Sequence, residues 1–313
     1  MNKICIVLCT YNGERFLERF LQSLTEQEKK ADVIVAYDDG STDSTLSILK
    51  NYGEKLPLKI FSGGINQGHR AAFNKALSLA KNEVDDSDFI ALADQDDEWL
   101  PNKLKILSES IQDKALVFGD ARVIDADGNL LGDSWRKFGS IPEKVSIRNQ
   151  IAGINNVTGC LSLFKASLLD AILPIPESVT VHDRWVAMIA ERRGGIFAIP
   201  QPVIRYRLHE SNAVGGKPVP KMSKTLRLQE TWVAGILENA ERIPLTKGEI
   251  LFAKRLLKLH RARLHKAFLP FELPWIFKNR ESLFLPGTFG KRLRQILFSA
   301  VGLPLAKKIW NKS

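Results

Sequence analysis

Over its first hundred residues the chain alternates short apolar runs with helix-like stretches, and this pattern constrains the fold more than any other feature. Residues 4–8 form a continuous apolar run, as expected of a strand buried on both faces of a parallel sheet. Residues 16–24 then place Phe and Leu at helical spacing. Further strands are predicted at 33–37, 58–61 and 89–93, with a helical segment between each pair. This alternation predicts an α/β sheet with right-handed crossovers.

Polar residues follow each of these predicted strands. Open α/β sheets bind their ligands just beyond the carboxyl ends of the strands. The four polar clusters therefore predict a binding site along one edge of the sheet. They are residues 10–14, 38–43, 66–70 and 94–97.

The rest of the chain gives weaker signals. Residues 125–128 (Asp-Ala-Asp-Gly) have the composition of a hairpin turn. Beyond Asn212 strand signals stop, residues 217–221 with two prolines indicate a linker, and basic helices are predicted over 226–242 and 249–268. Late strands are expected at 117–119, 160–164, 196–199 and 203–206, with helices at 167–172 and from His182 onward.

Composition excludes several classes of protein. The chain has 313 residues, of which 44% are hydrophobic and 26% charged, so it can bury a core and is not disordered. Three cysteines without a C-x-x-C pair exclude a disulfide framework and a Cys-based zinc site, and favour a reducing compartment. No signal peptide is predicted, and no apolar stretch reaches the roughly 18 residues of a membrane span.

Charge is divided unevenly along the chain. Residues 1–213 contain 25 Lys and Arg against 29 Asp and Glu, a net −4, whereas residues 214–313 contain 20 against 6, a net +14. A basic last third predicts an anionic partner, and DNA, RNA and phospholipid head groups all meet that requirement. The alternative is a solvated helical face with no partner.

The acidic segment 94–97 (Asp-Gln-Asp-Asp) follows an apolar run directly. Carboxylates gathered at a strand end repel one another, and burying them is costly unless a cation lies between them. Carboxylate oxygens suit Mg²⁺ or Mn²⁺, which also bind phosphate. The alternative is an acidic turn that caps a helix beginning near Pro101.

Two further clusters offer groups for a nucleotide. A carboxylate in the segment 38–43 can accept hydrogen bonds from a nucleobase or a ribose hydroxyl, or it can cap the helix that follows. The segment 66–70 (Asn-Gln-Gly-His-Arg) combines backbone donors and a guanidinium near a helix N-terminus, which suits phosphate.

Together these residues resemble glycosyltransferase family 2, and more narrowly its bacterial rhamnosyltransferase-like members. The resemblance covers about residues 1–213, and its most specific part is the acidic strand end with the Trp, Pro, Lys and Leu that follow it. The matching segments are 10–13, 38–43, 66–68, 94–97 with Trp99, Pro101, Lys103 and Leu104, His182-Asp183, and 206–209 with Asn212.

The resemblance implies a GT-A fold, which is a Rossmann-like, mostly parallel sheet with helices on both faces. It also implies a nucleotide-sugar donor, Mn²⁺ or Mg²⁺, and inversion at the anomeric carbon. The catalytic domain is expected over 1–213, and 214–313 is expected to form a basic amphipathic helical tail. The Q-x-x-R-W signature of processive synthases is absent from residues 182–185, which favours addition of a single sugar.

Site roles follow from the same resemblance, position by position. His182 departs from the family, in which an acid often precedes the base. The donor-binding positions are Thr10, Tyr11, Asn12, Glu14, Asp38, Asp39, Gly68, Arg70 and Asp94. The metal-binding positions are Asp96 and His209, the catalytic base is Asp183, and Asp97 is a substitute or supporting acid. Without the resemblance, Asp183 has the simpler interpretation of a helix N-cap.

The expected reaction moves one sugar from a UDP- or dTDP-sugar, with a leaning to dTDP-rhamnose, to a saccharide or lipid-linked glycan in cell-surface polysaccharide biosynthesis. The basic tail is expected to bind an anionic membrane surface, which places the protein in the cytoplasm on the inner face of the membrane, and no nucleic acid is expected. In the alternative interpretation, the tail aromatics pack on the catalytic domain or form a dimer contact. The alternative functions are a nucleotidyltransferase, a nucleic-acid-binding protein that uses the basic tail, and a non-catalytic sugar-binding protein.

Overall fold

The computed structural model of the chain describes residues 2–210, 212 and 221–310. The chain divides into two compact units, and each is described by itself. The first unit comprises Met1–Glu143, Val157–Ile175 and Val181–Lys217. The second comprises Lys144–Asn156, Pro176–Thr180 and Pro218–Ser313, so it includes two short segments from the earlier part of the chain.

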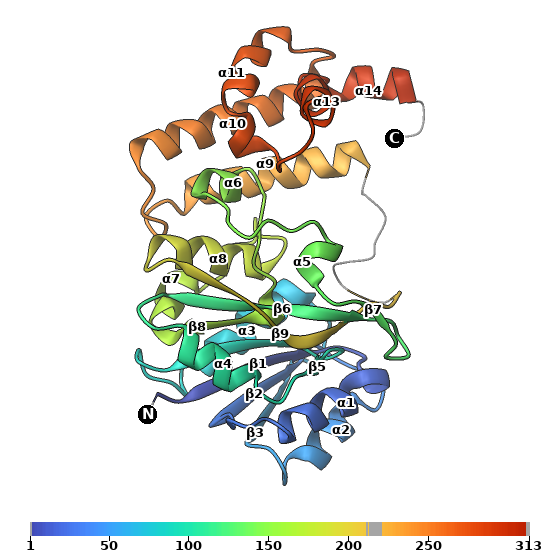
Figure 1. Ribbon diagram of the computed structural model, residues 1–313, viewed down its shortest axis with the longest axis vertical. Helices are drawn as coiled ribbons and strands as arrows, with labels where there is room; N and C mark the ends of the chain where they lie inside the picture. The colour runs from blue at the N-terminus through green and yellow to red at the C-terminus, as the bar shows by residue number, and fades with distance from the viewer. Residues whose placement is uncertain (1, 211, 213–220, 311–313) are drawn as a thin grey trace. The chain divides into compact units, whose positions relative to one another are not determined.

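A mixed nine-stranded sheet forms the centre of the first unit, and the predicted α/β class is confirmed (Figure 1). Its parallel part contains β1 (Ile4–Thr10), β2 (Val33–Asp38), β3 (Leu58–Ser62) and β4 (Phe89–Asp94), all at predicted positions. The strand order is β3-β2-β1-β4-β8-β6-β9-β5, and β7 pairs with β6. The remaining strands are β5 (Glu98–Trp99), β6 (Leu116–Ile124), β7 (Leu130–Gly132), β8 (Ser162–Lys165) and β9 (Ile196–Arg207).

Three helices connect the parallel strands: α1 (Glu14–Thr25), α2 (Thr45–Tyr52) and α3 (His69–Ala80). The chain passes from β1 to β2 to β3 in one direction and then returns past β1 to β4. Right-handed crossovers therefore put α3 on the opposite face of the sheet from α1 and α2. In agreement, α3 packs on β1 and β2, whereas α1 packs against α2. Helix α1 buries one apolar face made of Phe16, Leu17, Phe20, Leu21 and Leu24.

The carboxyl ends of three parallel strands lie at the same level of the sheet. Thr10 of β1 pairs with Asp38 of β2, and Cys9 pairs with Asp94 of β4. The strand order reverses between β1 and β4, and such a reversal is where open α/β sheets form a crevice for ligands. The polar clusters predicted after these strands therefore gather at one edge.

Several predicted boundaries were wrong. The segment expected as a strand at 160–164 begins as the short helix η1 (Gly159–Leu161), and β8 starts only at Ser162. The two expected late strands are one strand, β9, whose pairing with β6 contains an irregularity that interrupts the pattern in sequence. The helix expected at Pro101 is α4 (Lys103–Ser110), with Asn102 as its N-cap.

Turns and short helices complete the first unit. The hairpin turn predicted at 125–128 is confirmed between β6 and β7, where Asp125 Oδ1 accepts hydrogen bonds of 2.9 Å from the backbone N–H groups of Asp127 and Asn129. The remaining helices are α5 (Trp135–Phe138), η2 (Ala166–Leu168), α7 (Leu169–Ile172) and α8 (His182–Arg192).

Helices make up the second unit, as predicted for the basic part of the chain. The two longest, α9 (Met222–Glu238) and α10 (Lys247–His265), pack against each other, and each begins two to four residues before its predicted position. A capping box between Thr246 and Glu249 starts α10. The others are α6 (Ile147–Ile151), η3 (Pro270–Glu272), α11 (Leu273–Lys278), α12 (Arg280–Leu283), α13 (Phe289–Ser299) and α14 (Leu303–Trp310).

Two further expectations concern the linker before α9 and the crossing of a membrane. Most of the linker predicted at 217–221 lies outside the described residues. Within the described ranges, every helix is too short or too polar to cross a bilayer.

Candidate functional site

The loop after β4 carries the acidic motif to the edge of the sheet. Asp94 is the last residue of β4, and Asp96 lies two residues further along the chain. The Asp96 Oδ2 atom is 2.9 Å from His209 Nε2 and accepts a hydrogen bond of 3.2 Å from Asn212 Nδ2. Residues more than a hundred positions apart in the sequence therefore meet at this acid, and the predicted pair Asp96 and His209 is in direct contact.

Arg207, at the end of β9, holds the acidic loop in place. Its backbone N–H donates to Asp97 Oδ1 at 3.0 Å, and its Nε donates to the backbone oxygen of Asp96 at 2.9 Å. The guanidinium also forms an ion pair with Glu98 and is buried. Arg207 was part of the motif seen in the sequence, but no role was predicted for it, because its partners lie about 110 residues away.

Replacing Arg207 should therefore destabilise the first unit. We expect Arg207→Ala to cost about 3–5 kcal/mol, because it removes a buried guanidinium, breaks its ion pair with Glu98, and leaves the backbone oxygens of Asp96, Asp125 and Ala126 without their donor. Arg205 on the same strand is a matched control, since its side chain is 47% exposed and lies 3.5 Å from Glu98. Arg205→Ala should cost about 1 kcal/mol or less. Urea unfolding measures this difference, and equal losses would contradict it.

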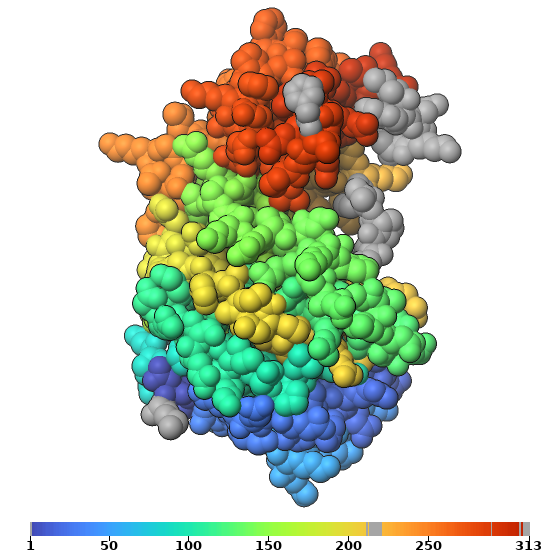
Figure 2. All heavy atoms as spheres, in the orientation of Figure 1, coloured from blue at the N-terminus to red at the C-terminus, as the bar shows by residue number. Residues whose placement is uncertain are grey.

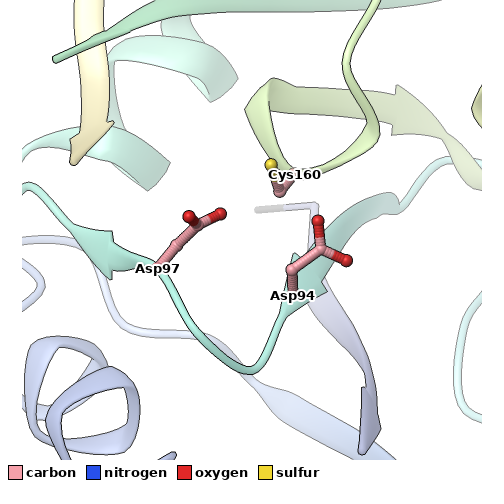
Figure 3. A group of neighbouring side chains, drawn as sticks. All are labelled: Asp94, Asp97 and Cys160. Atoms are coloured by element: carbon pink, nitrogen blue, oxygen red, sulfur yellow. The ribbon is translucent and has the colours of Figure 1, made fainter. Parts of the chain in front are cut away.

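Behind the acidic loop lies a buried polar cluster, shown in Figure 3. Ligand atoms of Asp94, Asp97 and Cys160 lie within 4.8 Å of one another. The Asp97 Oδ2 atom is buried and has no hydrogen-bond partner in the described residues. Lys103, fully buried, donates to the Cys160 backbone oxygen at 2.6 Å, and its Nζ lies 3.2 Å from the centroid of the Trp99 ring. No local pattern predicts this cluster, because Cys160 comes from η1, distant in sequence from the acidic loop, and Lys103 comes from α4 on the far side of that loop.

Burial controls the protonation of this cluster. Burial, and then the charge of Asp96, raise the pKa of Asp94 to about 7. The same two causes raise the pKa of Asp97 well above its ordinary value. Burial lowers the pKa of Lys103 to about 7. At neutral pH the cluster can thus share protons among its members, and added positive charge at the edge would favour the ionised carboxylates.

The donor atoms of the site decide which residues suit a hard divalent cation. Burial raises the pKa of the Cys160 thiol well above its ordinary value, so it remains a neutral thiol, a poor ligand for Mg²⁺ or Mn²⁺. Carboxylates and an imidazole suit Mn²⁺ better. By the chemistry of its donors, the contacting pair of Asp96 and His209 therefore suits a cation better than the group that contains Cys160.

Asp38 and Asp39, at the end of β2, have different surroundings. Asp38 accepts a hydrogen bond of 2.9 Å from Thr10 Oγ1 and another of 2.9 Å from the backbone of Ser41. Asp39 accepts from the backbone N–H groups of Gln67 and Gly68, the latter at 2.9 Å. The Asp39 carboxylate thus fixes the loop that precedes α3.

Gly68 and Arg70 lie at the start of α3. Gly68 is the N-cap, with φ +85°, and a Cβ atom there would meet nothing within 4 Å. Open space beside a left-handed glycine lets another molecule approach the backbone closely. The Arg70 Nη1 atom donates to the Ile175 backbone oxygen at 3.3 Å, and this hydrogen bond orients the guanidinium.

The loop after β1 is joined to its neighbours by side chains. Gln95 accepts from the Tyr11 backbone N–H and donates to the Tyr11 carbonyl, both at 2.9 Å. Asn12 accepts from the backbone of Thr42 at 2.9 Å, and Glu14 accepts from the backbone of Ser44 at 3.0 Å. The loops after β1, β2 and β4 are therefore one connected network, and the Tyr11 side chain stays exposed.

Asp183 lies in the first turn of α8. Val181 is the N-cap of this helix, so the interpretation of Asp183 as an N-cap is wrong. Its Oδ1 atom is buried and has no partner in the described part of the chain. Burial raises the pKa of Asp183 to about 6, against the smaller lowering effects of Arg184 and the Gly159 backbone. The two acids are close in the fold, because Asp183 packs at Gly159 and the next residue, Cys160, lies within 4.8 Å of Asp94. The charge of Asp183 accordingly contributes to the raised pKa of Asp94.

Close packing at Gly159 fixes the start of α8. A Cβ atom on Gly159 would lie 3.2 Å from His182 Nε2 and 3.4 Å from the Asp183 Cβ. The ring of His182 stacks on Phe73 at a centroid distance of 3.7 Å, and its Nδ1 is 3.2 Å from His69 Nε2. The residue that departs from the family pattern is therefore packed between helices.

The first unit combines three features of a GT-A transferase. They are a Rossmann-like sheet, an acidic loop held by His209 and Arg207, and a buried carboxylate at the start of a helix. The model of the family "Glycosyl transferase family 2" matches residues 5–173, more than half of the chain, and the chain belongs to this family. The family expected from the sequence is thus confirmed, and with it the enzyme class of glycosyltransferase.

Two relatives illustrate the family. The chain is 35% identical over 220 residues to an uncharacterized glycosyltransferase of Nostoc sp., a match that covers 67% of this chain and 66% of that relative, just under two thirds of its length. It is 26% identical over 287 residues to the dTDP-rhamnosyl transferase RfbG of Shigella flexneri, covering 84% of this chain and 97% of that one.

Solved structures share the fold. Residues 1–349 of TarS from S. aureus, in complex with UDP-GlcNAc, superpose with a TM-score of 0.58 at 17% identity, covering 95% of this chain and 81% of that one. The mannosyltransferase PcManGT of Pyrobaculum calidifontis, in complex with GDP-Man and Mn²⁺, gives a TM-score of 0.52 at 18% identity, covering 99% and 88%. At these identities the likeness establishes the GT-A fold.

Proposed function

We propose that the protein is an inverting, metal-dependent glycosyltransferase that moves one sugar from a nucleotide-diphosphate sugar to a saccharide or lipid-linked glycan in cell-surface polysaccharide biosynthesis. One observation carries the proposal. The Asp96–His209 contact at 2.9 Å and the buried carboxylate of Asp183 occur in one site, at the edge where the strand order reverses. Family membership favours this function over a nucleotidyltransferase or a nucleic-acid-binding protein.

The donor would lie along the ends of β1, β2 and β4. The proposed nucleoside contacts are Thr10, Tyr11, Asn12 and Glu14 with Asp38 and Asp39, and the backbone at Gly68 would approach the nucleotide. Asp94 would lie nearest the ribose, and Arg70 would lie near the phosphates. The relative from Shigella flexneri is named for dTDP-rhamnose transfer and the TarS structure contains UDP-GlcNAc, so a dTDP- or UDP-sugar is the proposed donor.

Asp96 and His209 would hold Mn²⁺ or Mg²⁺. The fit rests on oxygen and imidazole donors at one point and on the raised pKa of Asp94, which positive charge would restore toward its ordinary value. Once bound, the cation would neutralise the diphosphate leaving group. The mannosyltransferase PcManGT was crystallised with Mn²⁺, which supports this choice of metal.

Asp183 is the proposed general base. An acceptor hydroxyl has a pKa far above neutrality, so a carboxylate must take its proton as the new bond forms. The Asp183 Oδ1 atom has no partner in the described residues and is free to accept that proton. The absence of a side chain at Gly159 lets the start of α8 pack closely beside this segment.

A nucleotide screen tests the proposal most directly. UDP, dTDP and GDP are each added with and without Mn²⁺, and the melting temperature of the full chain is followed. We expect one nucleoside diphosphate to raise it in the presence of Mn²⁺ and to have little effect after EDTA treatment. The corresponding sugar nucleotides are then assayed for release of that diphosphate. No stabilisation by any of the three would contradict the proposal.

The pH dependence of turnover should report Asp183. Its pKa of about 6 lies above the ordinary value of 3.8, so the carboxyl is protonated, and inactive as a base, below about pH 6. We expect kcat/KM to fall by about tenfold per pH unit below this point and to level off above it. The profile is measured between pH 4.5 and 8.5 under conditions in which the chain stays folded. A profile that is flat from pH 5 to 8 would remove Asp183 from this role.

A further inference from the structure

Helix α13 of the second unit presents apolar side chains on its outer face. Leu293 and Leu297, one helical turn apart, are 46% and 48% exposed. Ile296 and Ala300 face inward and are buried. An ordinary amphipathic helix buries its apolar face and exposes a polar one, whereas α13 has large apolar residues on both sides. The atoms of residues 290–300, red-orange in colour, reach the surface in Figure 2.

Neighbouring elements add to this exposed surface. Helix α11 packs against both α13 and η3. Phe271 of η3 is 92% exposed, and Phe277 of α11 is 58% exposed. Monomeric proteins rarely leave several large apolar residues exposed on adjacent elements unless they contact a partner or a membrane. We call Phe271, Phe277, Leu293 and Leu297 the apolar patch.

Cations surround the apolar patch. Lys278 follows Phe277 directly, and Lys291 and Arg294 flank Leu293; all three are exposed. In the part of the chain that the structure describes, none of them has a carboxylate within ion-pair distance. The two acids of this region are already paired, Glu272 with Arg255 at 2.6 Å and Glu281 with Arg292 at 2.9 Å. The surface therefore has a net positive charge.

We propose that the apolar patch and its three cations are a docking surface for an anionic lipid bilayer. Apolar side chains enter the interface between head groups and acyl chains, and lysine and arginine remain at the head groups. A second copy of the chain fits less well, because a symmetric contact would bring the same cations against each other. Membrane docking would bring the enzyme to a lipid-linked glycan, and only this purpose of the docking surface rests on the proposed function.

Vesicle flotation of the full-length chain tests the proposal. The vesicles contain phosphatidylcholine alone or with about 30% phosphatidylglycerol, at low and at high salt. We expect the chain to float with the anionic vesicles at low salt and to be released by salt. Each cation near the surface contributes roughly fivefold to the partition constant. Lys291→Gln/Arg294→Gln should therefore lower binding by about 25-fold.

Matched variants separate the apolar and the basic parts of the surface. Leu293→Gln/Leu297→Gln should abolish flotation, whereas Leu251→Gln, at a 70% exposed leucine of α10, should not. Lys50→Gln/Lys75→Gln removes two exposed charges from the helices of the first unit and serves as the charge control. Circular dichroism confirms that each variant is folded.

Three results would overturn this inference. They are the absence of flotation, equal flotation of patch and control variants, and a concentration-dependent dimer in analytical ultracentrifugation that the leucine variant abolishes. Nucleotide and Mn²⁺ stabilisation is measured on the same preparations and should not change in the patch variants. If the wild-type chain binds nucleotide but does not float, the docking surface alone is contradicted. If it floats but does not bind nucleotide, the proposed function alone is contradicted.

Discussion

Asp183→Asn should reduce kcat by about 100- to 10,000-fold while the protein still binds its nucleotide and metal. The amide has nearly the shape of the carboxyl, so the packing of Gly159 against the start of α8 should survive. What it loses is the ability to take the proton of the acceptor hydroxyl. Turnover is measured as release of the nucleoside diphosphate, and binding as the thermal shift produced by that diphosphate with Mn²⁺.

The stability of the same variant distinguishes a base from a structural acid. Because burial raises the pKa of Asp183 from 3.8 to about 6, the folded state favours the neutral carboxyl. The stability that this carboxyl contributes is complete below about pH 4, falls as the pH rises to about 6, and is absent above that. Asp183→Asn should therefore melt higher than the wild type at pH 8 and no higher at pH 4. Asp127→Asn, in an exposed turn, is the matched control and should change neither turnover nor melting. Turnover within about tenfold of the wild type would exclude the base role.

Asp96→Ala should abolish the effect of metal on nucleotide binding. This acid contacts both His209 and Asn212, so its removal takes a ligand from the proposed cation and one hydrogen-bond partner from each of those side chains. We expect nucleotide affinity in the presence of Mn²⁺ to fall by at least about 10- to 100-fold, and affinity in EDTA to remain near that of the wild type. Isothermal titration with and without Mn²⁺ measures both.

Two further variants show whether the effect of Asp96→Ala is specific to the metal site. Asp86→Ala, at an exposed acid of the turn before β4, removes the same charge from outside the site and should change neither affinity. His209→Ala should weaken the metal effect without abolishing it, because the carboxylates remain. If Asp96→Ala binds the nucleotide as the wild type does in Mn²⁺, the cation is held elsewhere, and the buried cluster with Cys160 becomes the alternative site.

The parallel half of the sheet was predictable because its signals are local. A strand such as β1 is buried on both faces and reads as an unbroken apolar run, and the turn residues after it stand beside it in the sequence. Alternation with helices then dictates parallel strands whose carboxyl ends share one edge. The acidic loop and the α/β class follow from patterns of fewer than twenty residues, whereas the predicted donor positions come from the resemblance to the family.

Late elements were harder to predict because their positions depend on distant partners. Strand β5 has two residues and exists only through pairing with β9, about 105 residues away. Strand β9 appeared as two strands, since an irregular pairing with β6 interrupts its pattern. Neither the pairing of β5 nor the irregular pairing of β9 produces a hydrophobic periodicity that can be recognised in the local sequence.

Contacts within the site depend most strongly on the folded chain. The sequence shows Asp96, Arg207 and His209 as separate polar residues, and residue types alone gave no role to Arg207. Folding brings β4 and the end of β9 together, which pairs Asp96 with His209 and buries Arg207 behind the acidic loop. Burial also raises the pKa of Asp183 to about 6, a change that composition cannot reveal because it comes from the exclusion of water by neighbouring elements.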